Sequence, residues 1–272
     1  MSNNAIITEK KYRKLTIKVS PEGLSFCCHD TLSGAVLSLR EVDFSKYPRA
    51  TRTEDHYWKA FVDNIELTRT YDSVSVIHDN NLNTFVPQPL FDVDYMGSYL
   101  QYNTKVFETD FFDYDELLNY DMNNVYIPYV NINNFLLDQF GTFEYHNANT
   151  ILVSRLLDTA RNQTDPHVYA HFSKGRFEIV VLQHQKLVLF NSFDFTTKED
   201  FLYYLLFTAE QLSLNPEVFH LSLLGEVEKD SDLFRMAYKY VRNVSLYDVS
   251  ALAEKNGLSA AENLKHFILL QS

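Results

Sequence analysis

The sequence is poor in the residues that break, bend or cross-link a chain: among 272 residues there are seven Gly, seven Pro and two Cys. So few Gly and Pro argue against long disordered linkers. Cys27 and Cys28 are neighbours, whose side chains point to opposite faces of a strand, so they do not pair with each other. The lack of a disulfide framework, of a signal-peptide core and of a membrane-length apolar run predicts a cytoplasmic protein without membrane contact.

Basic residues are also scarce. Lys and Arg number 24 against 36 Asp and Glu, which gives a formal net charge of −12. Such a chain is repelled by phosphate backbones, so we expect no direct nucleic-acid binding. One short basic run, at residues 10–14, has two interpretations: a small basic patch, or the solvated entrance to a strand. The mass of 31.8 kDa and a hydrophobic share of 46% predict two globular domains.

The first half of the chain predicts three strands, a helix and a further strand. Alternating apolar and polar residues indicate the strands, and Trp58, Phe61 and Ile65 are spaced to form the buried face of the helix. The predicted strands cover residues 14–20, 24–30, 35–44 and 73–77.

The second half repeats this order. Thr197 and Asp200 form a capping box for a helix whose apolar stripe contains Phe201, Leu205 and Ala209. The predicted strands cover residues 167–173, 176–183, 186–194, 218–224 and 244–248, and a second helix covers 231–241.

The two halves are related by nearly constant spacings. The helix starts are 145 residues apart, and the fourth strands are 144 residues apart. Two interpretations are open: an internal duplication, or two unrelated α/β domains. The polar, proline-containing stretch at 161–166 is the expected join, which predicts domains at 1–163 and 164–272.

This order of elements is that of the ribonuclease H-like fold, and two copies resemble the actin-like ATPases, including their pilus-assembly members. More narrowly, the chain is similar to an uncharacterised bacterial domain-of-unknown-function family through FVPQPLFD at 85–92, Tyr99-Leu100 and NVYIPYV at 124–130. The resemblance implies an α/β protein with two ribonuclease H-like domains in tandem, each a mixed five-stranded sheet with helices. It implies no established activity.

In active members of that superfamily, the first hairpin of each half cradles phosphate with an Asp-x-Gly motif followed by Ser or Thr. In the first half of this chain Ser20 stands in place of the Asp, Pro21 has no N–H to donate, and Glu22 places a negative charge before Gly23.

The second half departs from the pattern in the same way. Ser173 replaces the Asp before Lys174 and Gly175, and Leu224 with Gly225 replaces the Gly-Gly pair that would contact adenosine. The resemblance therefore predicts that ATP turnover is lost and that no cofactor is bound.

Other catalytic or metal sites have weak support. A two-metal nuclease needs an acid on the first strand, which has none, and Asp79 is expected in a turn. His167 and His171 share one face of a strand, where a metal site is an alternative to two structural histidines. Cys27 beside His29 is a candidate nucleophile, although buried strand cysteines are commoner. We predict no catalytic and no metal residues.

The stretch at residues 107–130 combines aromatic and acidic residues. It is interpreted either as an amphipathic helix with its entering loop, or as an acidic surface for a partner protein with a basic face. The function predicted from the sequence is a non-catalytic binding or scaffold module. The alternative is a nucleotide-binding protein or weak ATPase with an altered site in the cleft between the halves.

Overall fold

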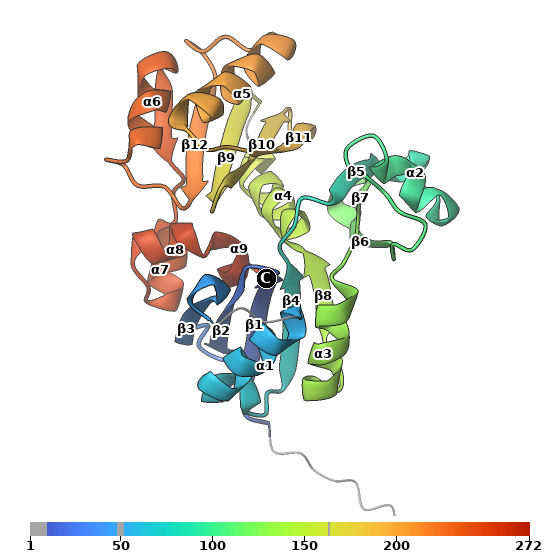
Figure 1. Cartoon of the computed structure of the whole chain (residues 1–272). Coiled ribbons are helices and arrows are strands. Elements are labelled where there is room, and N and C mark those ends of the chain that lie inside the picture. Colours follow the sequence, from blue (N-terminus) through green and yellow to red (C-terminus); the bar gives the residue numbers. More distant parts are fainter. Residues whose placement is uncertain (1–9, 48–51, 163) are drawn as a thin grey trace, which may run out of the picture. The chain divides into compact units, whose positions relative to one another are not determined.

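The computed structural model describes residues 10–47, 52–162 and 164–272, and the chain divides into two compact units (Figure 1). Unit 1 contains the described residues up to Asp79 together with Tyr129–His146, and unit 2 contains Asn80–Pro128 and Asn147–Ser272. The predicted domains 1–163 and 164–272 are the two sequence repeats, which differ from these compact units, and the division into repeats stays a prediction. Gln163, at the predicted join, lies outside the described residues.

Unit 1 is built on a five-stranded sheet whose strand order is β3-β2-β1-β4-β8. Its first three strands are antiparallel, and β1 runs parallel to β4, so the sheet is mixed as predicted. The strands are β1 (Arg13–Ser20), β2 (Gly23–Asp30), β3 (Val36–Asp43), β4 (Ser73–His78) and β8 (Glu144–Asn147).

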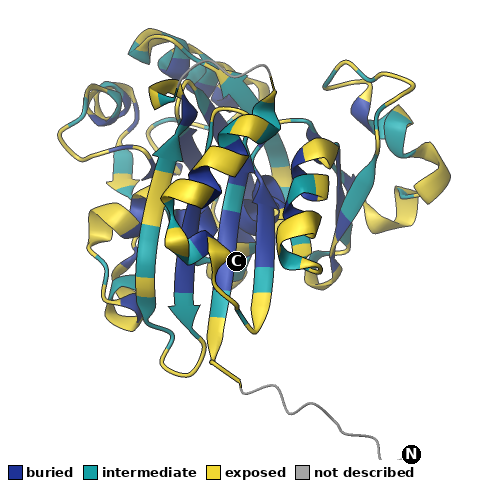
Figure 2. Cartoon of the chain, turned by 60° about the horizontal axis from the view of Figure 1, so that its bottom comes forward, coloured by how far each residue is buried: buried dark blue, intermediate teal, exposed yellow. Residues whose placement is uncertain are grey.

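Unit 2 contains a second five-stranded sheet, and its order, β11-β10-β9-β12-β13, has the same pairing. The central strands of the sheets are largely buried (Figure 2). The strands are β9 (His167–Ser173), β10 (Arg176–Gln183), β11 (Lys186–Asp194), β12 (His220–Gly225) and β13 (Asn243–Leu246).

Helices cover these sheets, and no helix in the described part of the chain is long and apolar enough to cross a bilayer. The helices of unit 1 are α1 (Thr53–Asp63) and α3 (Val130–Phe140). Those of unit 2 are α2 (Met96–Leu100), α4 (Ala148–Thr159), α5 (Lys198–Gln211), α6 (Asp232–Tyr240), α7 (Ser250–Asn256), α8 (Ala260–Lys265) and α9 (Phe267–Leu270). Short 3-10 helices lie at Phe44–Lys46, Ile65–Thr68, Gln88–Leu90, Val93–Tyr95, Leu118–Tyr120 and Ala160–Asn162.

The two predicted amphipathic helices differ in outcome. In α5 the capping box of Thr197 and Asp200 is present, and the predicted stripe from Phe201 is buried. In α1 the predicted face is wrong, because Trp58 is 63% exposed and Ile65 is 65% exposed. The residues that α1 buries are Tyr57, Ala60 and Phe61, spaced i, i+3 and i+4, and the α-helix ends at Asp63, before Ile65.

The helix predicted as one interpretation of residues 107–130 does not form. The segment instead contains the strands β6 (Asp113–Leu117) and β7 (Met122–Tyr126), which pair with β5 (Asn83–Pro87) in the order β5-β7-β6. Asp115 and Leu117 point inward with the period of two that strands require. Asp121 reverses the chain with φ of 51°, a left-handed conformation that Asp tolerates.

A buried carboxylate connects this small sheet to α4. Asp115 is 7% exposed, and its Oδ2 accepts the backbone N–H of Asn147 at 2.9 Å and a hydrogen bond from the hydroxyl of Thr150. The hydroxyl of Tyr126 donates to its other oxygen, and Asn124 Nδ2 donates to Thr150 Oγ1 at 2.8 Å. The acid therefore belongs to the interior, contrary to the interpretation of the stretch as an acidic surface at this position.

Asn80 extends the network to the points where the chain enters and leaves unit 2. Its side-chain NH2 donates to the carbonyl of Ile127 at 3.0 Å, and its oxygen accepts from Asn147 Nδ2 at 3.3 Å. These three residues lie next to the three places where the chain passes between the units. One side chain thus holds together three segments that are distant in the sequence.

We predict that Asp115→Ala lowers the free energy of unfolding by about 3 kcal/mol, because it leaves buried donors on Asn147, Thr150 and Tyr126 without their acceptor. The measurement is urea denaturation followed by circular dichroism. The matched control is Glu116→Ala, the exposed neighbour on the same strand, for which we expect a change within about 0.5 kcal/mol. Equal effects of the two substitutions would refute a structural role for the buried acid.

Candidate functional site

The hairpin turn of unit 1, where the resemblance would place a phosphate, is closed by its own polar atoms. Ser20 Oγ donates to the carbonyl of Gly23 at 3.2 Å and accepts the N–H of Glu22 at 3.2 Å. The hydroxyl of Tyr57, from α1, donates to the carbonyl of Ser20 at 2.8 Å. Position 20 has no carboxylate for a metal, and Pro21 has no N–H, so the turn lacks the ring of donors that would bind phosphate.

Close packing of β2 against β3 explains why residue 23 is glycine. A Cβ at this position would lie 2.4 Å from the carbonyl oxygen of Val42 on β3, so the close approach of two strands excludes a side chain. This contact accounts for the glycine without a ligand.

The hairpin turn of unit 2 is an exposed tip with one basic side chain. Ser173 ends β9, Lys174 is exposed, and Gly175 adopts φ of 73°, as a tight hairpin requires. Arg176, the next residue, turns inward, where its Nε donates to Glu178 Oε1 at 2.7 Å. The two basic residues that flank Gly175 therefore do not act together at the tip.

Gly225 ends β12 with φ of 85°, and its surroundings are protein backbone. A Cβ there would lie 2.1 Å from the carbonyl oxygen of Phe172, and the following N–H, of Glu226, donates to that same oxygen at 2.8 Å. Its neighbour Leu224 is fully buried. The glycine matched to the adenosine motif thus serves the approach of β12 to β9.

The acid that a nuclease would use is neutralised by a lysine on the neighbouring strand. Asp79 follows β4, and its carboxylate forms an ion pair with Lys18 of β1 at 2.8 Å. The predicted turn follows, with the N–H of Leu82 donating to Asn80 Oδ1 at 3.0 Å. A cation therefore lies beside Asp79, where a two-metal site would need further acids.

The two histidines proposed as metal ligands have separate partners. His167 Nε2 lies 2.8 Å from Ser222 Oγ, and His171 Nδ1 lies 2.9 Å from Glu178 Oε2. Within the described ranges no group of three or more His, Cys, Asp or Glu residues is arranged to hold a metal ion. Both contacts are internal to the sheet and its buried polar groups.

The structure brings Cys27 and His29 together, with 3.5 Å between Sγ and Nε2, but the electrostatic setting is unfavourable for a nucleophile. Burial raises the pKa of Cys27 to about 12, and charge on Cys28 adds to the shift. Burial also raises the pKa of Cys28. A nucleophile needs the thiolate, and the raised pKa values disfavour the thiolate of both cysteines.

Glu178 is the centre of a buried charge cluster that the sequence analysis missed. The residue is 1% exposed, and its carboxylate is contacted by His171, Arg176 and Ser192 from three adjacent strands. The signal in the sequence was an acid within the apolar strand RFEIVVLQ. These three contacts come from β9, β10 and β11, so the cluster helps to fix the alignment of the three strands.

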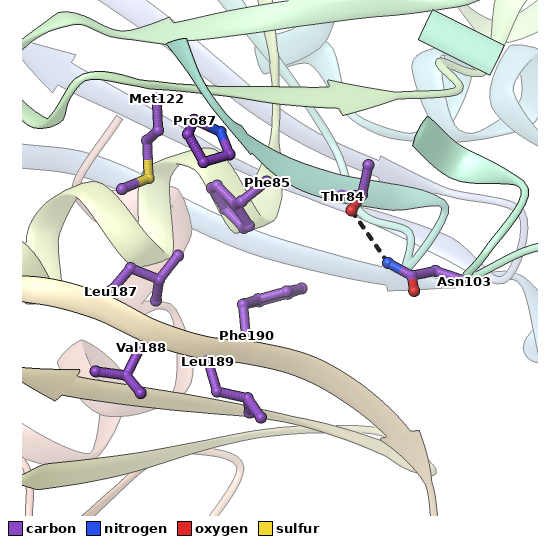
Figure 3. Close-up of a pocket in the computed structure, with 9 residues that line it drawn as sticks. All are labelled: Thr84, Phe85, Pro87, Asn103, Met122, Leu187, Val188, Leu189 and Phe190. Carbon is purple, nitrogen blue, oxygen red and sulfur yellow. Dashed lines mark hydrogen bonds between the residues drawn. The ribbon is translucent and has the colours of Figure 1, made fainter. Parts of the chain in front are cut away.

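The sequence analysis also missed a small pocket in unit 2. It has a volume of about 200 Å³ and lies between the small sheet and the edge strand β11 (Figure 3). Phe85 and Phe190 line it and contact each other edge to face with ring centres 5.0 Å apart, and Thr84, also in the lining, accepts a hydrogen bond from Asn103. Its lining combines apolar and polar surface, and its size suits one side chain rather than a nucleotide.

Sequence comparison identifies a family whose profile matches the chain. The profile of the family described as "Protein of unknown function (DUF3822)" matches residues 2–244. No match was found among curated proteins.

Structure comparison supplies the fold. The chain is similar to a protein of unknown function with an actin-like ATPase fold from Bacteroides thetaiotaomicron, with 22% identity and a TM-score of 0.80 over 97% of both chains. It is also similar to a chain of the PilM-PilN type IV pilus biogenesis complex, with 12% identity and a TM-score of 0.64 over 94% of this chain and 96% of that one. These likenesses confirm the predicted α/β fold of the actin-like ATPases.

Gly225→Ala is expected to destabilise the protein by more than about 4 kcal/mol, because the new Cβ meets the backbone of Phe172 in a left-handed conformation. Gly141→Ala is the matched control: its φ is 77°, but nothing lies within 4 Å of its Cβ position. At Gly141, backbone strain alone should lower the free energy of unfolding by about 1 kcal/mol. Equal losses in thermal denaturation would show that the approach of Phe172 is not what demands glycine.

His167 is expected to make stability depend on pH. Burial, with a smaller effect of charge on His220, lowers its pKa from 6.5 to about 4. Between these values the unfolded chain binds the extra proton, so stability falls as pH drops from 6.5 to 4, by up to about 1.4 kcal/mol per pH unit. His167→Gln should remove this dependence in urea titrations, whereas His184→Asn, at an exposed turn, should not. A parallel pH profile for wild type and His167→Gln would contradict the assignment.

Proposed function

The chain belongs to the DUF3822 family of proteins of unknown function, and we propose that it is a non-catalytic protein-binding module on an actin-like ATPase fold. In this proposal two copies of one ancestral unit, joined near residues 161–166, form the scaffold. The identical strand orders of the two five-stranded sheets support the duplication.

The observation that carries the proposal is the closed turn after β1. Ser20 Oγ and the N–H of Glu22 bind each other, so the donors that would contact phosphate are used internally. The Glu22 side chain adds a negative charge to the same turn. A phosphate would have to displace these bonds and approach a carboxylate, which is unfavourable.

Unit 2 offers the observation that favours the alternative, a nucleotide-binding protein or weak ATPase. Lys174 is an exposed cation beside Gly175, a pair that suits an anion. Against this, Ser173 supplies no carboxylate for a metal, and the space beside Gly225 is taken by the backbone of Phe172. We therefore favour the binding module.

A protein is the class of partner that the chain suits best. The pocket beside Phe85 and Phe190 has the size to receive one side chain of a partner, with aromatic rings in its lining. One structure of this fold is described as a complex of PilM with PilN. The formal net charge of −12 disfavours nucleic acid, and two free cysteines fit a cytoplasmic location.

The test is thermal denaturation with and without Mg-ATP, together with an assay of released phosphate. A ligand at one hundred times its dissociation constant adds about 2.7 kcal/mol of stability, so binding would be visible as a rise in the melting temperature. We expect no rise and no phosphate release. Saturable binding of Mg-ATP that weakens in the exposed variant Lys174→Ala would contradict the proposal and support the alternative.

A further inference from the structure

The outward face of α5 carries two exposed aromatic rings between two acids. Tyr203 is 62% exposed and Phe207 is 46% exposed, one helical turn apart. Glu199 precedes Tyr203 by four residues and Glu210 follows Phe207 by three, so all four share one face of the helix. Single exposed aromatic residues are ordinary, but two neighbouring rings flanked by acids form a surface with its own chemistry.

The rings are held in place by contacts that lead back to the core. Tyr203 stacks on Phe207 with ring centres 6.0 Å apart and 14° between the ring planes. Tyr203 also meets Tyr204 edge to face at 5.3 Å, and Tyr204 stacks on Phe193 of β11 at 4.4 Å. A partner that binds the exposed rings therefore meets side chains that are already ordered, which reduces the entropy lost on binding.

The charge of this face is negative and is not balanced from within the helix. Lys198 is the one basic residue of α5, and it reaches α6, where its Nζ lies 3.2 Å from Asp232. Glu199 and Glu210 are both exposed. Aromatic faces attract cations, and the two carboxylates strengthen the attraction for a positive group placed between them.

We propose that the face formed by Glu199, Tyr203, Phe207 and Glu210 is a docking surface for an arginine-bearing segment of a protein partner. A guanidinium group is planar and weakly hydrated, so it stacks on an aromatic ring while donating hydrogen bonds to a carboxylate. Lysine offers a compact, strongly hydrated charge and stacks less well. The inference rests on the proposed function of a protein-binding module and adds the place and chemistry of the contact.

The segment at 107–130, which the sequence pointed to for a basic partner, is a weaker candidate. Asp115 in that segment is buried, and Asp110 accepts the N–H of Phe107 at 2.8 Å. The face of α5 presents both its acids and its rings to solvent.

The probe is a short fluorescein-labelled peptide of alternating arginine and alanine, compared with its lysine counterpart by fluorescence anisotropy. We expect saturable binding of the arginine peptide that is tighter than that of the lysine peptide. Tyr203→Ala with Phe207→Ala should weaken the arginine peptide about tenfold, the product of two exposed cation–π contacts. Glu199→Gln with Glu210→Gln should weaken both peptides and reduce the salt dependence of binding.

Further variants separate the face from general effects. Tyr203→Leu with Phe207→Leu keeps an apolar surface and the fold but removes the aromatic faces, so preference for arginine should disappear. Tyr238→Ala on α6 and Glu254→Gln on α7 remove an exposed ring and an exposed acid elsewhere, and both should leave affinity unchanged. Circular dichroism verifies that each variant is folded.

The proposal is overturned if the arginine peptide does not bind, if arginine and lysine peptides bind equally, or if the folded aromatic variants bind as wild type does. None of these results bears on the assay with Mg-ATP. The proposed docking surface can therefore be refuted while the proposed non-catalytic function is retained. Nucleotide binding in that assay would instead remove the premise on which the docking surface rests.

Discussion

The buried carboxylate of Asp115 is the constraint on which unit 2 depends. A carboxylate removed from water must have its oxygens occupied by donors, and here these donors come from the start of α4 and from β7. Its negative charge also lies at the N-terminal end of α4, where the helix dipole is favourable. Meeting these demands fixes where the small sheet sits against α4.

That attachment adds to a small apolar core. The buried apolar cluster of the small sheet and its helix consists of Val86, Leu100 and Val125, with partly buried neighbours packed against it, so polar contacts carry a larger share of its attachment than in the larger sheets. Asn80 continues the same network to Ile127 and Asn147, so hydrogen bonds connect the segments next to the chain crossings. Hydrogen bonds are directional, and they therefore specify one arrangement of these segments.

Local sequence patterns predicted the strands, but contacts between residues distant in the sequence were not predicted. The strands 167–173, 176–183 and 186–194 were predicted at their observed bounds, because alternation and turn residues are local. Two of the partners of Asp115, Asn147 and Thr150, lie 32 and 35 residues away, so no local pattern identified this acid as buried. The pocket at Phe85 was missed for the same reason, since its other wall comes from β11. In α1, apolar residues line two faces, and only packing shows that Tyr57 rather than Trp58 faces the core.

Gly23 in the turn after β1 and Gly225 at the end of β12 are both required by approaching backbone oxygens, so packing alone accounts for these glycines. The carboxylate of an Asp-x-Gly motif has no such packing role, and Ser20 instead closes its turn with hydrogen bonds. Fold and site chemistry are therefore separable, because backbone contacts can maintain a fold while the side chains of its sites differ. The proposed docking surface accordingly lies on a face that folding leaves exposed, the outward side of α5 with Tyr203 and Phe207.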